Sequence, residues 1–282
     1  GTITVTANDI SIGDATDTDS GGIKLTANGS TGGGKIALTT ADATNDITMT
    51  STQSLDASGA ITTTKGNIVL TAGNDIDLGD KVTATAGSVT LTSTNDAITS
   101  GVDALITGTS VNITDGKFAL TGITTTGGAG VTISGDTDIT ASGTVTSDVV
   151  TVTSTNDVVL TMMTEADASQ GVILAGAAAT GKITVSGVTT ASGTATLVSG
   201  SGVDNITVAD VDTKYVISTG LGADTVTVSA GDYTGVGNTI ATGGDGDTIN
   251  LDATSGAFTI DAGAGDDEVI LNKRAITGTF VL

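Results

Sequence analysis

The segment Val89-Thr90-Leu91-Thr92 decides the fold, because eight other segments of the chain repeat its spacing of apolar residues. They are Ile3-Thr4-Val5-Thr6, Ile23-Lys24-Leu25-Thr26, Ile47-Thr48-Met49-Thr50, Ile68-Val69-Leu70-Thr71, Val111-Asn112-Ile113-Thr114, Val131-Thr132-Ile133-Ser134, Val150-Thr151-Val152-Thr153 and Val172-Ile173-Leu174-Ala175. The nine first residues span 169 residues in eight steps, or about 21 residues a step. A fixed period of this size is typical of a solenoid.

The alternation within each segment predicts a β-strand, because successive side chains of a strand point to opposite faces. The first and third residues are apolar throughout and are expected to form the interior of the coil. The fourth residue, mostly Thr, is expected to form an outward ladder along stacked coils spaced ~4.8 Å apart. No stretch has the apolar spacing of a helix. The sequence therefore predicts an all-β fold, a parallel β-helix (β-solenoid) with coils of 20 to 21 residues.

A second recurring element is an Asn-Asp pair between two apolar segments. Asn and Asp tolerate left-handed backbone and hydrogen-bond to their own turn, so we interpret these pairs as coil corners rather than ligand sites. The pairs are Asn8-Asp9, Asn45-Asp46, Asn74-Asp75, Asn95-Asp96 and Asn156-Asp157.

The rhythm changes near residue 196, where apolar centres follow one another more closely and glycine becomes denser. We therefore divide the chain into a solenoid of 21-residue coils at 1–195 and a continuous run of glycine-rich coils at 196–282. Three loops read Gly-x-Gly-x-Asp-x-Ile/Val, and a fourth, Gly244-Asp245-Gly246-Asp247, reads as one residue short. The three are Gly200-Ser201-Gly202-Val203-Asp204, Gly220-Leu221-Gly222-Ala223-Asp224 and Gly263-Ala264-Gly265-Asp266-Asp267.

At these loops the sequence resembles the hemolysin-type, or RTX, calcium repeat G-G-x-G-x-D-x-U-x. The resemblance implies that loops stacked on one edge of a β-roll hold Ca²⁺ between them, through Asp carboxylates and glycine-rich backbone carbonyls. Four stacked loops would give up to three sites between loops. The alternative is that the loops are plain corners of a β-helix. The implied calcium-binding residues are Gly202, Asp204, Gly222, Asp224, Asp245, Asp247, Gly265, Asp266 and Asp267.

The texture of the first two thirds resembles the β-helices of secreted surface proteins, such as filamentous-haemagglutinin-type adhesins. Strings such as Gly66-Asn67-Ile68-Val69-Leu70-Thr71-Ala72-Gly73 carry this likeness. Together with the RTX-like loops, the chain also resembles calcium-dependent bacterial surface-layer proteins. These resemblances imply an extracellular or cell-surface location.

Composition excludes several other classes of function. The 282 residues include no Cys, His, Pro or Trp, so disulfide scaffolds, Cys/His metal sites and His-dependent catalysis have no residues to build with. The net charge of -22 argues against a nucleic-acid partner. No apolar run approaches the ~20 residues of a transmembrane helix. Only one Arg and two Tyr could serve a sugar-processing site, and we do not expect an enzyme.

The expected function is structural: a calcium-stabilised extracellular rod that builds a surface layer, fibre or matrix. Neither end has a polar cap, which predicts self-association, head to tail or in a lattice, or an excerpt of a longer solenoid. Two alternatives stay open. One is an adhesin segment that binds cell-surface glycans. The other is an ice-binding face built from Thr-x-Thr pairs, although Lys24, Val69 and Asn112 interrupt one of the two Thr columns.

Overall fold

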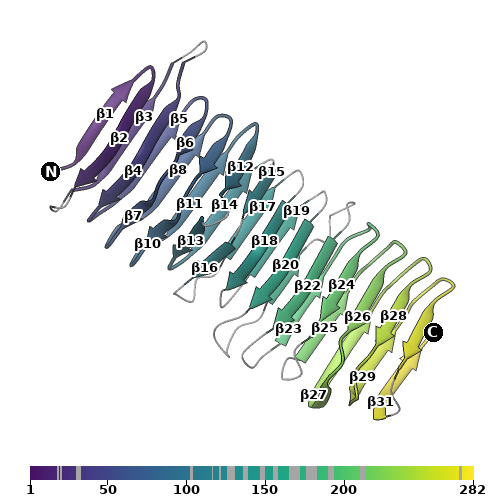
Figure 1. The fold of residues 1–282 in the computed structure, drawn as a ribbon. Helices are drawn as coiled ribbons and strands as arrows, with labels where there is room; N and C mark the ends of the chain where they lie inside the picture. The colour runs from purple at the N-terminus through teal and green to yellow at the C-terminus, as the bar shows by residue number, and fades with distance from the viewer. Residues whose placement is uncertain are drawn as a thin grey trace. The chain divides into compact units, whose positions relative to one another are not determined.

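The computed structural model consists of short β-strands joined by corners (Figure 1). It describes residues 1–17, 19, 21–29, 33–101, 104–115, 117–120, 122–125, 131–135, 139–146, 150–154, 158–164, 172–175, 183–189, 194–209, 214–272 and 275–282. Helices are absent from these residues, so the described part of the chain holds no helical membrane span. The predicted all-β parallel solenoid with coils of about 21 residues is confirmed. The Asn-Asp pair at 156–157 lies outside the described residues.

The chain divides into two compact units, an N-terminal unit of residues 1–144 and a C-terminal unit of residues 145–282. The boundary predicted between residues 195 and 196 marks a change of coil type, and it stays a prediction.

Two parallel sheets build the N-terminal unit. Sheet A contains β1 (Ile3–Ala7), β3 (Ile23–Ala27), β5 (Ile47–Ser51), β8 (Ile68–Ala72), β11 (Val89–Ser93), β14 (Val111–Asp115) and β17 (Val131–Gly135). Sheet B contains β2 (Ile10–Asp17), β4 (Ile36–Ala43), β6 (Leu55–Ala57), β7 (Ile61–Thr63), β9 (Ile76–Leu78), β10 (Val82–Ala84), β12 (Ala97–Ser100), β13 (Leu105–Gly108), β15 (Lys117–Leu120), β16 (Gly122–Thr125) and β18 (Ile139–Thr146), whose last two residues belong to the C-terminal unit.

The register of sheet A is the one that the repeated segments predict. Ile23 pairs with Ile3 on one side and with Ile47 on the other, and Val89 pairs with Ile68. The inward residues of these strands form an aliphatic interior that is almost fully buried: Ile23, Leu25, Ile47, Met49, Ile68, Leu70, Val89 and Leu91. In-register stacking therefore places each apolar residue on its equivalent one coil away, and this burial holds the coils together.

Sheet B is less regular, because one long strand can pair with two shorter strands of the next coil. The eight-residue strand β4 pairs with two shorter strands of the next coil, β6 and β7. Ala37 lies opposite Asp56, nineteen residues later, whereas Asp42 lies opposite Thr62, twenty residues later. The extra residue lies in the connection 58–60, which acts as a bulge and bends the sheet.

Strands of the C-terminal unit also form two parallel sets. One contains β19 (Val150–Ser154), β21 (Val172–Ala175), β23 (Thr194–Val198), β25 (Lys214–Ser218), β27 (Asp232–Ala241), β29 (Ser255–Asp261) and β31 (Ala275–Val281). The other contains β20 (Val158–Thr164), β22 (Ile183–Thr189), β24 (Asn205–Val208), β26 (Thr225–Val228), β28 (Thr248–Leu251) and β30 (Glu268–Leu271).

The core of the C-terminal unit contains an aromatic cluster that the low aromatic content did not lead us to expect. Tyr215, Tyr233 and Phe258 are at most 1 % exposed. The ring centroids of Tyr215 and Tyr233 lie 6.5 Å apart, and those of Tyr233 and Phe258 lie 5.9 Å apart in an edge-on arrangement. Such pairs add packing energy beyond the area that they bury.

Candidate functional site

The four glycine-rich loops all have six residues and occupy equivalent places in successive coils. Each follows a strand of the β23–β25–β27–β29 set and ends with an Asp directly before a strand of the other set. The loops are 199–204, 219–224, 242–247 and 262–267. The sequence predicted that the loop around Gly244-Asp245-Gly246-Asp247, the third of the four along the chain, is one residue short, and this prediction is wrong. This loop begins at Thr242, and Gly243 and Gly244 take the places of Gly220 and Leu221.

A ladder of hydrogen bonds joins the four terminal aspartates, which we call the Asp column. The backbone N–H of Asp204 donates to Oδ1 of Asp224 at 2.9 Å, and that of Asp224 donates to Oδ1 of Asp247 at 2.8 Å. The N–H of Asp247 donates to Oδ1 of Asp267 at 2.9 Å. The predicted stacking of these loops on one edge of the solenoid is therefore confirmed. The carboxylates of Asp224, Asp247 and Asp267 each cap the loop of the preceding coil with one of their two oxygens.

The carboxylates of the Asp column point into the solenoid. Asp224 lies two and four residues before the buried Val226 and Val228, and alternation along the strand places all three side chains on the inner face. Asp204, Asp224 and Asp247 are each 1 % exposed. The second carboxylate oxygen, Oδ2, of Asp224 and of Asp247 has no hydrogen-bond partner. A buried carboxylate oxygen without a partner is costly, and it is open to a proton, a cation or a water molecule.

Electrostatics of the Asp column agree with this geometry. Burial raises the pKa of Asp224 from 3.8 to about 6, and the neighbouring carboxylates of Asp204 and Asp247 add to the rise. The Asp204 N–H and the nearby Thr219 hydroxyl act in the opposite direction, although that hydroxyl donates its hydrogen bond to the Thr242 carbonyl oxygen at 3.1 Å. Burial raises the pKa of Asp247 in the same way. Ionisation of these two aspartates is therefore less favourable in the folded chain than in water.

A ladder of hydroxyl groups lies at the start of the same loops. Ser199 donates to the carbonyl oxygen of Thr219 at 3.0 Å, and Thr242 donates to that of Ala262 at 3.0 Å. These buried hydroxyls were missed among the predicted site residues. The signal was a hydroxyl residue directly before the first glycine, which three of the four loops share.

The backbone of the loops leaves no room for a Cβ at several of the glycine positions. A Cβ on Gly222 would collide with the carbonyl oxygen of Gly202, and one on Gly265 would collide with that of Asp245. Gly222 and Gly265 also have positive φ angles of 114° and 154°. Asp245 occupies this same column with φ of 76°. An Asp in a glycine position explains why the third loop was misaligned.

The two remaining predicted residues lie on the outer side of the loops. Asp245 is exposed, and its Oδ2 accepts a hydrogen bond from the Gly222 N–H at 3.2 Å. Asp266 is also exposed and lies one residue before the Asp column. The structure thus separates the predicted set into an inner carboxylate column, a glycine column that includes Asp245, and the outward Asp266.

The donor set of the loops matches what calcium prefers, which is hard oxygen ligands from carboxylates and backbone carbonyls. Each loop contributes one carboxylate of the Asp column, which is buried in the first three loops and half-buried at Asp267. Carbonyl oxygens of the close-packed glycine columns would therefore have to supply much of the coordination. Among the residues that the structure describes, no three Asp, Glu, His or Cys side chains form a group that could hold a metal ion. Carboxylates alone would therefore not complete a calcium site here.

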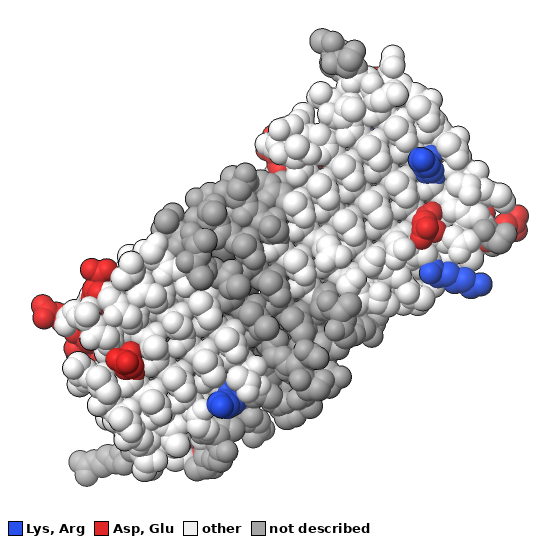
Figure 2. Space-filling view, turned by 180° about the vertical axis from the view of Figure 1, so that it is seen from behind, with Lys and Arg blue, Asp and Glu red and all other residues white. Residues whose placement is uncertain are grey.

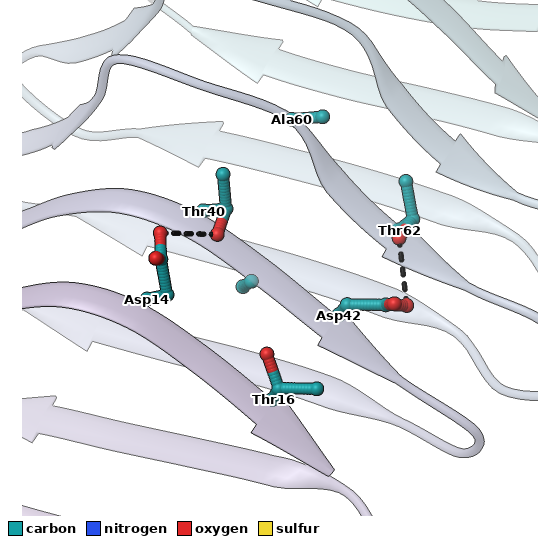
Figure 3. Close-up of a pocket in the computed structure, with 7 residues that line it drawn as sticks. Asp14, Thr16, Thr40, Asp42, Ala60 and Thr62 are labelled. Atoms are coloured by element: carbon teal, nitrogen blue, oxygen red, sulfur yellow. Dashed lines mark hydrogen bonds between the residues drawn. The ribbon is translucent and has the colours of Figure 1, made fainter. Parts of the chain in front are cut away.

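A second polar site lies on sheet B of the N-terminal unit. A shallow hollow of about 410 Å³ lies over β2, β4 and the start of β7, beside the bulge, with Ala60 at one side (Figure 3). Thr40 donates a hydrogen bond to Asp14 at 2.7 Å, and Thr62 donates one to Asp42 at 2.8 Å. The hollow thus presents carboxylates and hydroxyls.

Comparison of the chain with protein-family models, with curated proteins and with solved structures finds no match.

Proposed function

We propose that the chain is an extracellular structural protein, a calcium-stabilised β-solenoid of RTX-like and surface-layer-like character that self-assembles into a cell-surface layer, fibre or matrix. The observation that carries the proposal is the Asp column. Its buried Asp224 and Asp247 each leave one carboxylate oxygen without a hydrogen bond. Asp204, Asp224, Asp247 and Asp267 would contribute these carboxylates, and the loop backbone would contribute carbonyl oxygens.

Calcium would supply positive charge where the fold concentrates negative charge. The net charge of -22 opposes compaction, and the Asp column places several like charges inside the solenoid. A cation that binds the folded loops and not the unfolded chain stabilises the fold by mass action. Coils that are loose at low calcium and rigid at extracellular calcium follow from this linkage. The proposal gives the chain no catalytic step.

The test is a calcium titration of the purified chain, from chelator to millimolar calcium, with circular dichroism and light scattering recorded together. A gain in β-structure with a growth in particle size is the expected result. A gain in β-structure without a growth in particle size would contradict the proposed self-assembly but not the proposed calcium binding. A chain whose signal is unchanged over the whole range would overturn the calcium proposal.

A second candidate function, glycan adhesion, is favoured by the hollow on sheet B. Carboxylates and hydroxyls are groups that hydrogen-bond to sugar hydroxyls, and Asp14, Thr40, Asp42 and Thr62 present both around it. Binding to a glycan array that Asp42→Asn abolishes, with unchanged circular dichroism, would support this candidate. Binding that the substitution leaves intact would contradict it.

The ice-binding alternative depends on two regular Thr columns. On sheet A the register gives one column without interruption, Thr6, Thr26, Thr50, Thr71, Thr92 and Thr114. The neighbouring column contains Lys24, Val69 and Asn112. We therefore place the structural function before ice binding.

A further inference from the structure

The outer face of sheet A in the N-terminal unit has no acidic residue in its two outward columns. Its strands β1, β3, β5, β8, β11, β14 and β17 present two outward columns. The first is the Thr column from Thr6 to Thr114, and the second is Thr4, Lys24, Thr48, Val69, Thr90, Asn112 and Thr132. We call these two columns the Thr face. Lys24 is the one charged residue among them, and its sign is opposite to the net charge.

Sheet B of the same unit has the contrasting pattern. Asp14, Asp42, Asp56 and Asp77 all lie on its outer side and are exposed. Asp56 pairs directly with Asp77 one coil later. Partial burial and then the Asp77 carboxylate raise the pKa of Asp56, which shows that like charges on this side already oppose one another within one molecule. The two sheets of one unit therefore differ sharply in charge.

This difference decides which surface a second copy can approach. Two chains with net charge -22 repel each other, and the repulsion is lowest where neither carries acidic groups. Figure 2 shows a face of the molecule on which charged side chains are few and regular rows of uncharged side chains fill the area between them. On the Thr face, exposed or half-buried Thr side chains offer a methyl group for packing and a hydroxyl that both donates and accepts hydrogen bonds.

The size of the Thr face also fits a second copy. Strands of five residues are about 16 Å long at ~3.3 Å a residue, and seven strands spaced ~4.8 Å apart extend about 29 Å. Two such faces in contact would bury about 1,000 Å² in total, the lower limit for a specific protein interface. A contact of this size is weak alone and is suited to a repeated contact within an assembly.

We propose that the Thr face of the N-terminal unit is a self-association surface, which packs face to face against the Thr face of a second copy of this chain. The contact is isologous, with the same residues on both partners. This inference rests on the proposed self-assembly and identifies the surface that performs it. It assigns assembly to the N-terminal unit, whereas calcium acts on the loops of the C-terminal unit.

Two substitutions with matched surroundings test the proposal. Thr71 and Thr83 are both half-buried, both lie in mid-strand and point outward, and each has Thr neighbours in the coils before and after it. Thr71 lies on the Thr face, and Thr83 lies on sheet B. Each is replaced by Asp in the full chain, and the molecular mass is followed by sedimentation velocity over a range of concentrations in millimolar calcium.

Thr71→Asp is expected to weaken association at least about tenfold, because the new carboxylates of the two copies would face each other in a desolvated contact. Thr83→Asp is expected to leave association unchanged. Equal association of both variants and the parent chain would overturn the Thr face as the contact. A parent chain that stays monomeric but adsorbs to ice or to a neutral polysaccharide through the Thr face would also overturn it.

These results are independent of the calcium proposal. Calcium-dependent circular dichroism of the C-terminal loops is expected to be the same in both variants. Its absence in the parent chain contradicts the proposed function, whereas its presence together with unaltered association of Thr71→Asp contradicts only the Thr face.

Discussion

The backbone N–H of Asp224 donates a 2.8 Å hydrogen bond to Oδ1 of Asp247, the residue at the same position one coil later. The other oxygen of the Asp247 carboxylate is buried without a hydrogen-bond partner. One side chain therefore combines a structural cap for its neighbour with a buried oxygen that is open to a proton or a cation. Substitutions at this residue can therefore separate the structural contribution of the Asp column from its proposed contribution to calcium binding.

Replacing Asp247 by Asn is expected to have opposite effects with and without calcium. The Asn side chain keeps an oxygen that can accept the Asp224 N–H, and it removes a buried charge. Stability in calcium-free buffer should be unchanged or higher, whereas the stabilisation by millimolar calcium should be largely lost. Asp247→Ala should cost about 1–3 kcal/mol in calcium-free buffer, because the Asp224 N–H loses its buried acceptor.

Urea unfolding followed by tyrosine fluorescence measures these effects in the C-terminal unit, because the chain has no Trp and both Tyr215 and Tyr233 lie in that unit. Asp261→Asn, at an exposed position of β29, is the control and should behave as the parent chain. An Asn variant that calcium stabilises as strongly as the parent would contradict the assignment of Asp247 to the ion.

Stability in the absence of calcium is expected to fall as the pH rises from about 4 to about 6. The folded-state pKa of Asp224 is raised from 3.8 to about 6, so within this window the folded chain holds a proton that the unfolded chain has released. The free energy of unfolding then decreases with pH until both states are ionised. Calcium bound to the ionised carboxylate, as we propose, should remove this decrease.

The measurement is urea unfolding at several pH values between 4 and 7, in buffer freed of calcium and in buffer with millimolar calcium. Asp224→Asn should flatten the calcium-free profile. A parent chain and an Asn variant with the same pH profile would show that Asp224 does not titrate as its surroundings imply.

Asp245 is expected to tolerate replacement by glycine and not by valine. Its φ of 76° is accessible to Gly and to Asp, whereas a β-branched residue is strained there. Asp245→Gly should change stability by less than about 1 kcal/mol, and Asp245→Val should cost about 2 kcal/mol or more. Thermal unfolding compares them with Asp266→Val, an exposed position of the next loop. Equal losses for both valine variants would indicate that backbone strain at Asp245 is not the cause.

The aromatic cluster should stabilise the C-terminal unit selectively. Tyr233 is buried between Tyr215 and Phe258, and its hydroxyl donates to the Ser229 carbonyl oxygen at 3.2 Å. Tyr233→Ala should cost about 3–5 kcal/mol, because it opens a cavity in the core. Tyr233→Phe should cost about 1 kcal/mol through the lost hydrogen bond. Fluorescence of Tyr215 reports the unfolding, and a loss below 1 kcal/mol for the Ala variant would contradict the packing.

Sheet A could be predicted from the sequence because its coils repeat two signals in one register. The apolar positions and the outward Thr positions agree from Ile3 to Val131, and a shift of one residue would expose every buried side chain. Sheet B lacks such a signal, since the connection 58–60 inserts a residue that changes the spacing between β4 and its two partners.

The candidate site could be predicted in part. The Asp column follows from the recurrence of Asp before a strand, and the structure brings Asp204, Asp224, Asp247 and Asp267 together. The third loop was misaligned because Asp245 occupies a position where glycine is the ordinary signal. The aromatic cluster was not predicted, since its residues come from different columns: Tyr233 pairs with Gly256, and Phe258 pairs with Asn238.

The most direct test of the calcium proposal is isothermal titration calorimetry of calcium into the calcium-free full chain. The comparison protein is a variant that carries both Asp224→Asn and Asp247→Asn. The account predicts saturable binding by the parent chain, coupled to a change in tyrosine fluorescence. It also predicts a loss of that binding in the double variant, which should stay folded in calcium-free buffer. Saturable binding that is equal in the two proteins, or no binding by the parent chain at millimolar calcium, would contradict the account.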